Sequence, residues 1–346
     1  MPLRPNFIER LLIRRGKVPW PILDALLPTF QAAAVTAAAE LGVFELLRQE
    51  ALAPEELARR TDATLAGTES LLHALAGLGY VECDDRKYRL TDAADRAVPA
   101  NEIRTMAPFL WELARLAGDS MRAIRDAPPG GVGDPERIQG GDIGRAFQTA
   151  MRRIAAGHVD EVRRNLKLPA SARRLLDVGG AHGLHTVALC RKYPRLHGTI
   201  LDWPVGIASA RRTLADNPDV ADRIDLVERD FERDALPDGY DVAFLGNIVH
   251  GLSPERNQAL FRKLARATTP SATLVILDQV AEQDGSPFAR ALAGLIGFHL
   301  FVVTGGRAYR LAQLEHWLGD AGFPHVRRTP LRRAPGMSLV TARKQP

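Results

Sequence analysis

The sequence has few of the residues on which secreted or metal-dependent small folds are built. Only two of its 346 residues are cysteines, Cys83 and Cys190, and they lie in unrelated contexts. Two cysteines cannot form the disulfide framework of a secreted domain, and no Cys/His cluster has zinc-like spacing. His182 and His185 are close in sequence, but no further ligand lies near them. We therefore predict no metal site.

Long hydrophobic runs are also missing. Residues 1–17 contain Arg and Glu where a signal peptide needs an apolar core. The longest apolar stretch, residues 289–303, is interrupted by Arg290 and His299. It falls short of the about 18 uninterrupted apolar residues expected of a membrane span. We therefore expect a cytoplasmic protein that has no membrane partner.

Neither sign of charge is in strong excess. The chain has 46 Lys and Arg against 41 Asp and Glu, a net charge of +5 with neutral histidines. So small and diffuse an excess suits an acidic or aromatic ligand and does not indicate nucleic-acid binding. The composition, 46% hydrophobic and 25% charged, is that of a globular protein. The length is sufficient for two domains.

The first hundred residues are predicted to be mostly helical. Apolar residues recur at helical spacing, Gly42 marks a break or a point of close packing, and two short strands follow. The predicted elements are a helix at 30–47, helices beginning near residues 53 and 68, and strands at 80–83 and 87–90. This order predicts a winged-helix domain over residues 1–100.

Residues 101–168 are predicted to be a helical linker, with a helix at 101–124, a Gly- and Pro-rich loop at 127–144, and a helix at 147–166.

From Arg174 onward, strands alternate with helices, which indicates a parallel sheet covered on both faces. The predicted strands are 175–178, 198–201, 224–227, 241–245 and 273–277; the helices are 185–192, 205–215, 254–267 and 311–322. Two end strands, near 325–330 and 338–341, can pair antiparallel at the edge of the sheet. The predicted fold is therefore α/β and Rossmann-like, with its sheet domain at residues 169–346.

A glycine loop follows the first predicted strand of that sheet. Asp177 lies at the end of the strand, and Gly179, Gly180 and Gly183 follow it. Glycines let a backbone turn tightly and approach a ligand closely. A dinucleotide-binding loop would read G-x-G-x-x-G, whereas this one reads G-G-x-x-G after the aspartate. A simple tight turn, with the nearby acids capping helices, is the alternative.

Acidic residues also end the next two predicted strands. Asp202 ends the second strand, about twenty residues after the glycines, where an acid suits the hydroxyls of a ribose. Asp230 and Phe231 follow the third strand, where an acid and an aromatic ring can flank an adenine. Together with the glycine loop, these acids predict a nucleoside site at one edge of the sheet.

These motifs, with those of the following strands, occur in the order of a known family: DVGGAHG, ILDWP, RDF, DVAFLGNIVHGLSPE and LVILDQV. In them the chain resembles the plant and bacterial small-molecule O-methyltransferases that depend on S-adenosylmethionine. The winged helix extends the resemblance over nearly the whole chain. The resemblance implies a class I methyltransferase sheet, S-adenosyl-L-methionine as cofactor and S-adenosyl-L-homocysteine as product. It also implies a small-molecule acceptor and a homodimer formed through the winged-helix domain.

The resemblance also assigns cofactor contacts. It places Asp202 at the ribose hydroxyls and Asp230 with Phe231 at the adenine. The remaining cofactor-binding residues that it implies are Asp177, Gly179, Gly180, Gly183, Trp203 and Asn247. The chain departs from the family at Ala181, where the family has a third loop glycine, and at Gly246 and Asn247, which replace a basic or aromatic pair.

His250 stands where the family has its catalytic histidine, after the fourth predicted strand. An imidazole there can act as the general base that deprotonates the acceptor. A packed or helix-capping histidine is the alternative. Plant members have an aspartate at the position of Gly251 and a glutamate at the position of Ala308, so what orients His250 stays open. His299, on a helix that lines the family's acceptor pocket, is a second catalytic candidate, with ordinary packing as its alternative.

The resemblance further implies an acceptor pocket to which the linker contributes. Met151 falls near a family position that contacts the acceptor ring, and thioethers pack well on aromatic rings. Phe147, Phe109 and Trp111 are predicted pocket walls on the same reasoning. Core packing explains all four residues equally well.

Three functions remain distinguishable by sequence features. The first is an O-methyltransferase acting on a phenol, polyketide or related aromatic metabolite. The second is a C-methyltransferase, for example on a tetrapyrrole, or a member that binds the cofactor without transferring its methyl group. The acids missing at Gly251 and Ala308 keep this second function open. The third is a winged-helix DNA-binding regulator. Its recognition helix, residues 68–79, has no Lys or Arg, which contradicts nucleic-acid binding.

Overall fold

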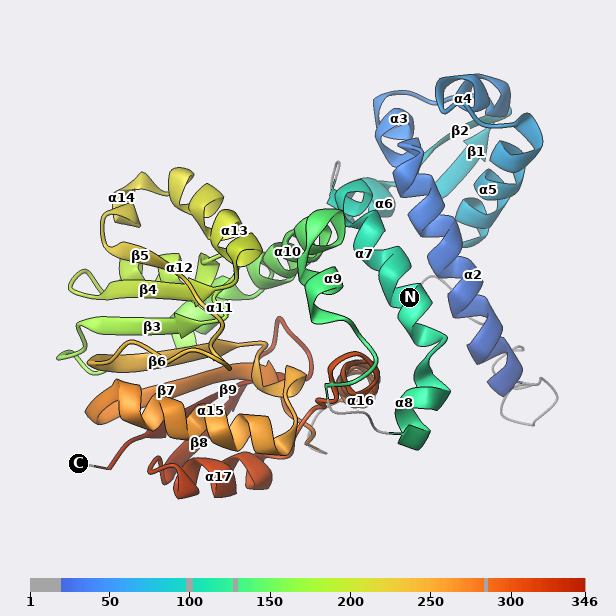
Figure 1. The fold of residues 1–346 in the computed structure, drawn as a ribbon. Coiled ribbons are helices and arrows are strands. Elements are labelled where there is room, and N and C mark those ends of the chain that lie inside the picture. Colours follow the sequence, from blue (N-terminus) through green and yellow to red (C-terminus); the bar gives the residue numbers. More distant parts are fainter. Residues whose placement is uncertain (1–19, 98–101, 127–129, 283–285, 346) are drawn as a thin grey trace. The chain divides into compact units, whose positions relative to one another are not determined.

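The computed structural model describes residues 20–97, 102–126, 130–282 and 286–345 (Figure 1). The chain divides into two compact units, residues 1–111 and 112–346. The boundary falls within α7 (Glu102–Ala117), so the predicted linker 101–168 is shared between the two units.

The first unit is a small helical domain with a two-stranded wing. Its elements are α2 (Trp20–Glu40), α3 (Val43–Gln49), α4 (Pro54–Arg60), α5 (Leu65–Gly77), β1 (Val81–Asp84), β2 (Lys87–Leu90) and α6 (Asp92–Ala97). Gly42 has a φ of 73° and separates α2 from α3, as the sequence predicts, although α2 begins ten residues earlier than expected. The strands pair antiparallel around the turn at Asp85, and Phe44, Leu57 and Leu72 lie in the core beneath them. The predicted winged helix is therefore present.

The second unit contains a seven-stranded sheet in the order β5-β4-β3-β6-β7-β9-β8. Its strands are β3 (Arg174–Val178), β4 (His197–Asp202), β5 (Ile224–Glu228), β6 (Tyr240–Gly246), β7 (Thr268–Gln279), β8 (His325–Pro330) and β9 (Met337–Arg343). The first five are parallel, and β9 pairs antiparallel with both β7 and β8. Each predicted strand is present, and the two end strands pair as expected.

Helices cover both faces of this sheet (Figure 1). The helices of the second unit that follow α7 are α8 (Ser120–Asp126), α9 (Pro135–Gln139), α10 (Gly141–Ala156), α11 (Val159–Asn165), α12 (Leu184–Lys192), α13 (Pro204–Ala215), α14 (Pro218–Ala221), α15 (Pro254–Ala267), α16 (Pro287–Thr304) and α17 (Leu311–Asp320). Alternate residues of β6 enter opposite cores: Val242 and Phe244 pack with α12 and α13, whereas Ala243 and Leu245 pack with α15 and α17. Strands buried on both faces explain the nearly continuous apolar runs in the sequence.

Three predicted boundaries in the linker are wrong. The predicted loop at 127–144 contains α9 and the first turn of α10, because Asp134 caps α9 by accepting backbone N–H bonds from Glu136 and Arg137. The single helix predicted at 147–166 is divided between α10 and α11, with Gly157 and His158 at the break. The helix predicted at 101–124 is likewise divided between α7 and α8.

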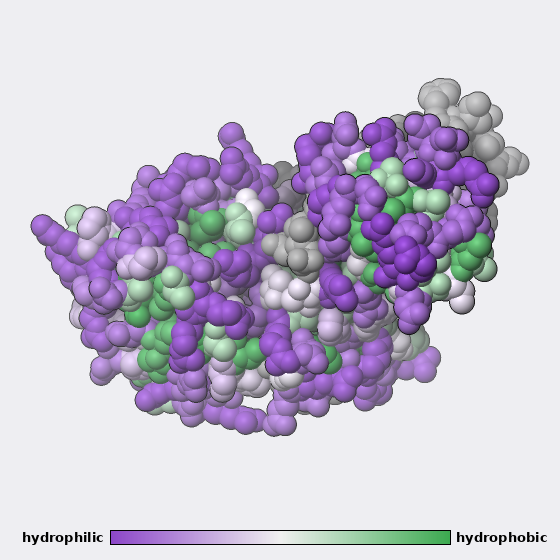
Figure 2. Space-filling model, turned by 90° about the horizontal axis from the view of Figure 1, so that it is seen from above, coloured by the Kyte–Doolittle hydropathy of each residue, from purple (hydrophilic) through white to green (hydrophobic). Residues whose placement is uncertain are grey.

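Two helices of the described chain are long and apolar enough to cross a membrane by composition: residues 22–40 within α2, and α16. Core helices of water-soluble proteins meet the same test, so this is weak support for a membrane span. On the face drawn in Figure 2, hydrophilic residues predominate and apolar residues form small separate patches. Single exposed apolar residues are normal on a protein surface.

Candidate active site

The glycine loop follows β3 at the centre of the sheet, between β4 on one side and β6 on the other. The strand order reverses at this point, and ligands of open α/β sheets bind at the carboxyl ends of the strands there. Gly179 has a φ of 66°, and a Cβ atom added to it would lie 2.3 Å from Cδ1 of Ile248. Gly183 has a φ of 69°, and its added Cβ would lie 2.7 Å from Cδ1 of Ile200. Both positions therefore require glycine for backbone conformation and for space.

Asp177 supports the loop from below. Its carboxylate is buried and accepts a hydrogen bond of 2.6 Å from the Thr186 hydroxyl. A Cβ added to Gly180 would lie 2.7 Å from the Asp177 carboxyl carbon, so the loop backbone rests directly on the acid. Burial, with a smaller contribution from the nearby Asp202, raises the pKa of Asp177 to about 7, while the Thr186 hydrogen bond acts in the opposite direction. The Asp177 carboxylate therefore contacts protein groups, the Thr186 hydroxyl and the loop backbone, beneath the glycines.

Asp202 joins the second strand to the same loop. Its carboxylate accepts the backbone N–H of Ala181 at 2.7 Å and that of Trp203 at 2.6 Å. Burial raises the pKa of Asp202 to about 6, while these two backbone bonds act in the opposite direction. Each carboxylate oxygen keeps a second lone pair for another donor, such as a ribose hydroxyl.

Gly206 is a site residue that the sequence analysis missed. A Cβ added to it would lie 2.4 Å from the Asp202 carboxyl carbon, so any larger residue would displace the carboxylate. The signal in the sequence was a glycine in the first turn of a helix, two residues after Pro204 at the start of α13.

The loop after β5 carries the predicted adenine contacts. The Asp230 carboxylate accepts the backbone N–H groups of Glu232 and Arg233 at 2.9 and 3.3 Å, and so caps the turn. Phe231 is half-buried, and its ring lies beside the glycine loop, 3.7 Å from a Cβ added to Gly179. The structure therefore brings Phe231 and the glycine loop together.

Two cations of α15 fix this loop. The Lys263 ammonium donates to the carbonyls of Phe231, Glu232 and Asp234 at 3.1, 2.5 and 2.9 Å. Arg256 forms a bidentate ion pair with Glu232, with N–O distances of 2.7 and 2.5 Å. Sequence analysis did not assign either cation, because their partners lie more than twenty residues away.

His250 lies in a 3₁₀ turn, Val249–Gly251, just beyond β6 and Asn247. Asp278, at the end of β7, accepts the His250 backbone N–H at 3.1 Å. The other Asp278 oxygen lies 2.6 Å from His250 Nδ1. The angle at Nδ1 is outside that of a hydrogen bond, so the two groups are in contact as a close polar pair. Asp278 is thus the acidic partner that Gly251 and Ala308 do not supply. The signal in the sequence was the aspartate of the LVILDQV strand.

His299 and Asn247 complete the surroundings of His250. His299 lies on α16 and is half-buried; burial lowers its pKa, and the nearby His250 imidazole lowers it further. Asn247 has a φ of 56° and donates its backbone N–H to Leu277 at 2.9 Å. The structure therefore brings both predicted catalytic histidines close enough to interact electrostatically.

The predicted pocket walls lie in both units. Phe109 is half-buried on α7, and Trp111 is exposed and donates its indole N–H to Glu40 at 2.9 Å; both belong to the first unit. Phe147 and Met151 are half-buried on α10 in the second unit. Their role as an acceptor pocket stays a prediction.

Three buried histidines lie beside the glycine loop. The His185 ring stacks on His158 with centroids 5.6 Å apart and lies 6.0 Å from His182. Burial lowers the pKa of all three, that of His182 to about 4. Among the described residues no group of His, Cys, Asp and Glu has the geometry to hold a metal ion. Their lowered pKa values keep these histidines neutral near pH 7.

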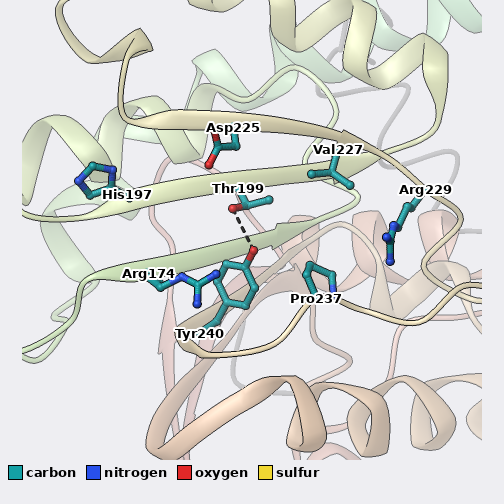
Figure 3. Close-up of a pocket in the computed structure, with 8 residues that line it drawn as sticks. All are labelled: Arg174, His197, Thr199, Asp225, Val227, Arg229, Pro237 and Tyr240. Atoms are coloured by element: carbon teal, nitrogen blue, oxygen red, sulfur yellow. Dashed lines mark hydrogen bonds between the residues drawn. The ribbon is translucent and has the colours of Figure 1, made fainter.

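A cavity of about 290 Å³ lies elsewhere in the same unit (Figure 3). Arg174 at the start of β3 and Tyr240 at the start of β6 line it, and the Tyr240 hydroxyl donates to Thr199 at 3.0 Å. It therefore extends toward the amino ends of the strands, whereas the glycine loop and His250 lie at their carboxyl ends. We place the candidate active site at the carboxyl ends, because loop geometry, buried acids and both histidines meet there.

Comparisons with known proteins identify the family of the chain. The family model of the O-methyltransferase domain matches residues 139–324, and that of the O-methyltransferase dimerisation domain matches residues 28–99. The 3-hydroxy-5-methyl-1-naphthoate 3-O-methyltransferase of Streptomyces sahachiroi is 29% identical, over 94% of each chain. The tetracenomycin polyketide synthesis 8-O-methyl transferase of Streptomyces glaucescens is 28% identical, over 90% of this chain and 93% of its own.

A solved structure shares the fold. The structure described as PigF with SAH superposes with a TM-score of 0.81 at 24% identity, and the match covers 94% of this chain and 100% of the other. Such structural neighbours have the class I methyltransferase fold. The O-methyltransferase domain model alone spans more than half of the sequence. The chain therefore belongs to the O-methyltransferase family and is an S-adenosylmethionine-dependent methyltransferase with an amino-terminal dimerisation domain.

Proposed function

We propose that this enzyme transfers a methyl group to a hydroxyl of an aromatic or polyketide-like small molecule, and that His250 is the general base. The observation that carries the proposal is the pairing of His250 with Asp278 at the carboxyl edge of the sheet, beside the glycine loop. The two curated relatives are named for acting on a naphthoate hydroxyl and in polyketide synthesis, which supports this acceptor class.

The residues at this edge fit the cofactor. When bound, S-adenosylmethionine supplies an electrophilic methyl group on a sulfonium. The loop of Gly179, Gly180 and Gly183 offers backbone without side chains, supported by Asp177 beneath it. Asp202 has oxygen lone pairs left for the ribose hydroxyls. In this proposal four further residues surround the adenine of the cofactor: Trp203, Asp230, Phe231 and Asn247.

His250 removes the acceptor's proton in this proposal. In this proposal Asp278, 2.6 Å from Nδ1, favours the tautomer with its proton on Nδ1, which leaves Nε2 to receive the acceptor's proton. A base placed within hydrogen-bond reach typically adds about 10²–10⁴-fold to a rate. Because burial lowers the pKa of His299, this second imidazole is neutral near pH 7. We assign it to orienting the acceptor hydroxyl.

We also propose that the enzyme acts as a cytoplasmic homodimer. The dimerisation-domain match supports this. Ile22, Leu26 and Phe30 are exposed by 58%, 45% and 61% at helical spacing on α2, which suits burial against a second copy. Sedimentation at micromolar concentration tests it: we expect twice the monomer mass, and a lower mass for the triple replacement of these three residues by serine.

The first experiment is a calorimetric titration of S-adenosylmethionine into wild type, Asp202→Ala and His250→Ala. We expect wild type and His250→Ala to bind alike, and Asp202→Ala to bind at least about tenfold more weakly, since it loses hydrogen bonds to the ligand. Tyr240→Phe, which loses a buried hydroxyl in the cavity of Figure 3, is the matched control and should bind as wild type does. Absence of binding by wild type would contradict the cofactor site.

Methyl transfer is then measured on a panel of phenols and hydroxynaphthoates, with the product's methyl group located by NMR. We expect an O-methyl product from wild type and a large loss of rate in His250→Ala. A C-methyl product would favour the alternative of carbon methylation. Cofactor binding without transfer to any acceptor would favour a member that does not methylate.

A further inference from the structure

We propose that Tyr309 and Asn257 form a buried polar clamp that positions the turn carrying His250. The structural part of this inference rests on the contacts of the turn. Its consequence for the reaction rests on the proposed function. Both are positioning residues, because they act through His250 and do not reach the reacting atoms.

The clamp holds the carbonyl groups on both sides of the histidine. The Tyr309 hydroxyl donates to the Leu252 carbonyl at 2.6 Å. The Asn257 amide donates to the carbonyls of Val249 and Leu252 at 2.9 and 3.1 Å. A single 3₁₀ turn has weak hydrogen-bond geometry of its own. Side-chain donors therefore decide where this turn, and with it the imidazole, is held.

Tyr309 is itself firmly fixed. It is 2% exposed, and its ring packs edge-on against Trp317 with centroids 4.9 Å apart. Its carbonyl accepts the backbone N–H of Ala281 at 2.9 Å, just beyond the end of β7. Asp278 lies at that strand end as well. Tyr309 therefore ties the histidine turn to the strand that supplies the histidine's acidic partner.

Asn257 acts on the turn through its donor atoms alone. The side chain is fully buried, yet its amide oxygen has no hydrogen-bond partner among the described residues. An unsatisfied buried oxygen is unfavourable, and an apolar residue of the same size would avoid it. What Asn257 adds at this position is its pair of donated hydrogen bonds to the turn.

The packing on the other side of the turn leaves little room for movement. A Cβ added to Gly306 would lie 2.1 Å from the His250 carbonyl oxygen, so the chain after α16 lies directly against the turn. The neighbouring Gly251 and Ala308 carry no acid that could orient the imidazole. The clamp and Asp278 therefore take over that task in this chain.

The test compares Tyr309→Phe with Tyr240→Phe. Each variant loses one buried tyrosine hydroxyl and the hydrogen bond that it donates, but only Tyr309 touches the histidine turn. The imidazole signals of the nine histidines are recorded by NMR on nitrogen-15-labelled full-length protein, and His250→Ala assigns the signal of His250. We expect that signal to shift or broaden in Tyr309→Phe and to stay in place in Tyr240→Phe. An unchanged His250 signal in a folded Tyr309→Phe variant would overturn the clamp.

Asn257→Leu is the second variant, since it keeps the side-chain volume and removes the donor. It tests the same expectation if Tyr309→Phe does not fold. With an acceptor from the phenol panel, we expect kcat of either variant to fall by about tenfold to a hundredfold, the effect of a misplaced catalytic group, with KM little changed. An acceptor that is already ionised should be affected far less. If wild type transfers no methyl group, the proposed function fails, while the His250 signal still decides the clamp.

Discussion

The Asp202 carboxylate accepts the backbone N–H of Ala181 at 2.7 Å, and this bond joins the end of β4 to the glycine loop after β3. Ala181 has a φ of 46°, a left-handed conformation that needs support in a residue other than glycine. One carboxylate therefore shapes the loop, and in the proposed function it also receives the ribose hydroxyls. The shape of the glycine loop and the predicted ribose contact thus both depend on the Asp202 side chain.

A change at Gly206 should disturb this carboxylate without removing it. We expect Gly206→Ala to weaken S-adenosylmethionine binding by about tenfold, since displacing a charged hydrogen-bond partner costs on the order of 1–2 kcal/mol. Calorimetry measures the affinity. Gly319→Ala, in α17 where an added Cβ meets nothing within 4 Å, is the control and should bind as wild type does. Equal affinities in all three proteins would contradict the role of this contact.

Replacement of Asp278 should separate catalysis from cofactor binding. In Asp278→Asn the carboxylate beside His250 Nδ1 is lost, so the imidazole is less well oriented toward the acceptor. We expect kcat for a weakly acidic phenol to fall by about a hundredfold, with unchanged affinity for S-adenosylmethionine. Asp241→Asn, at the start of β6, where the carboxylate accepts the backbone N–H groups of Arg173 and Arg174, is the control and should keep kcat. A normal kcat in Asp278→Asn would remove Asp278 from the mechanism.

The Lys263 ammonium should matter for the adenine loop. We expect Lys263→Met to weaken cofactor binding by about three- to tenfold, because the three loop carbonyls lose their donor and Phe231 is less well placed. Lys344 offers a matched control, since its ammonium donates to the carbonyls of Ala265 and Thr268 at the carboxyl end of α15 and does not contact the adenine loop. Lys344→Met should bind the cofactor normally. If both variants bind equally, Lys263 has no special role in the site.

The buried histidines should make the fold sensitive to acid. The folded-state pKa of His182, about 4, lies below its ordinary value of 6.5. The folded state therefore resists protonation, and His182 lowers the free energy of unfolding as the pH falls from about 6.5 to about 4, with no effect above that range. The full effect, for a shift of this size, is on the order of 3–4 kcal/mol.

His182→Asn isolates this effect. The Asn side chain can still accept the Leu184 backbone N–H that His182 Nδ1 accepts at 3.1 Å, and it does not titrate. Urea unfolding at pH 7.5 and pH 5 measures the difference between the two proteins. We expect wild type to lose more stability than the variant on acidification. Parallel loss in both proteins would show that His182 does not contribute.

Local patterns in the sequence were sufficient to predict much of the sheet and the cofactor edge. Apolar runs that end in glycine or an acid predicted β3, β4 and β5, and parallel strands necessarily bring their carboxyl ends to one edge. The positions of Asp177, Gly179 and Asp202 at that edge follow from chain order alone. The helix breaks at Gly157 and Gly118 were not predictable in the same way, because glycine also occurs within helices.

Contacts between segments far apart in the sequence could be identified only from the tertiary structure. Asp278 lies 28 residues from His250, and Tyr309 lies 57 residues from the carbonyl that it binds. No periodicity relates such positions, because their distance depends on how α15 and α16 pack against β7. Likewise, the sequence placed Asp177 and Asp202 at the same edge, and side-chain packing turned the first toward Thr186 beneath the loop and the second toward the loop backbone. The sequence thus determines where the chemistry is located, and the tertiary structure determines which groups hold it in place.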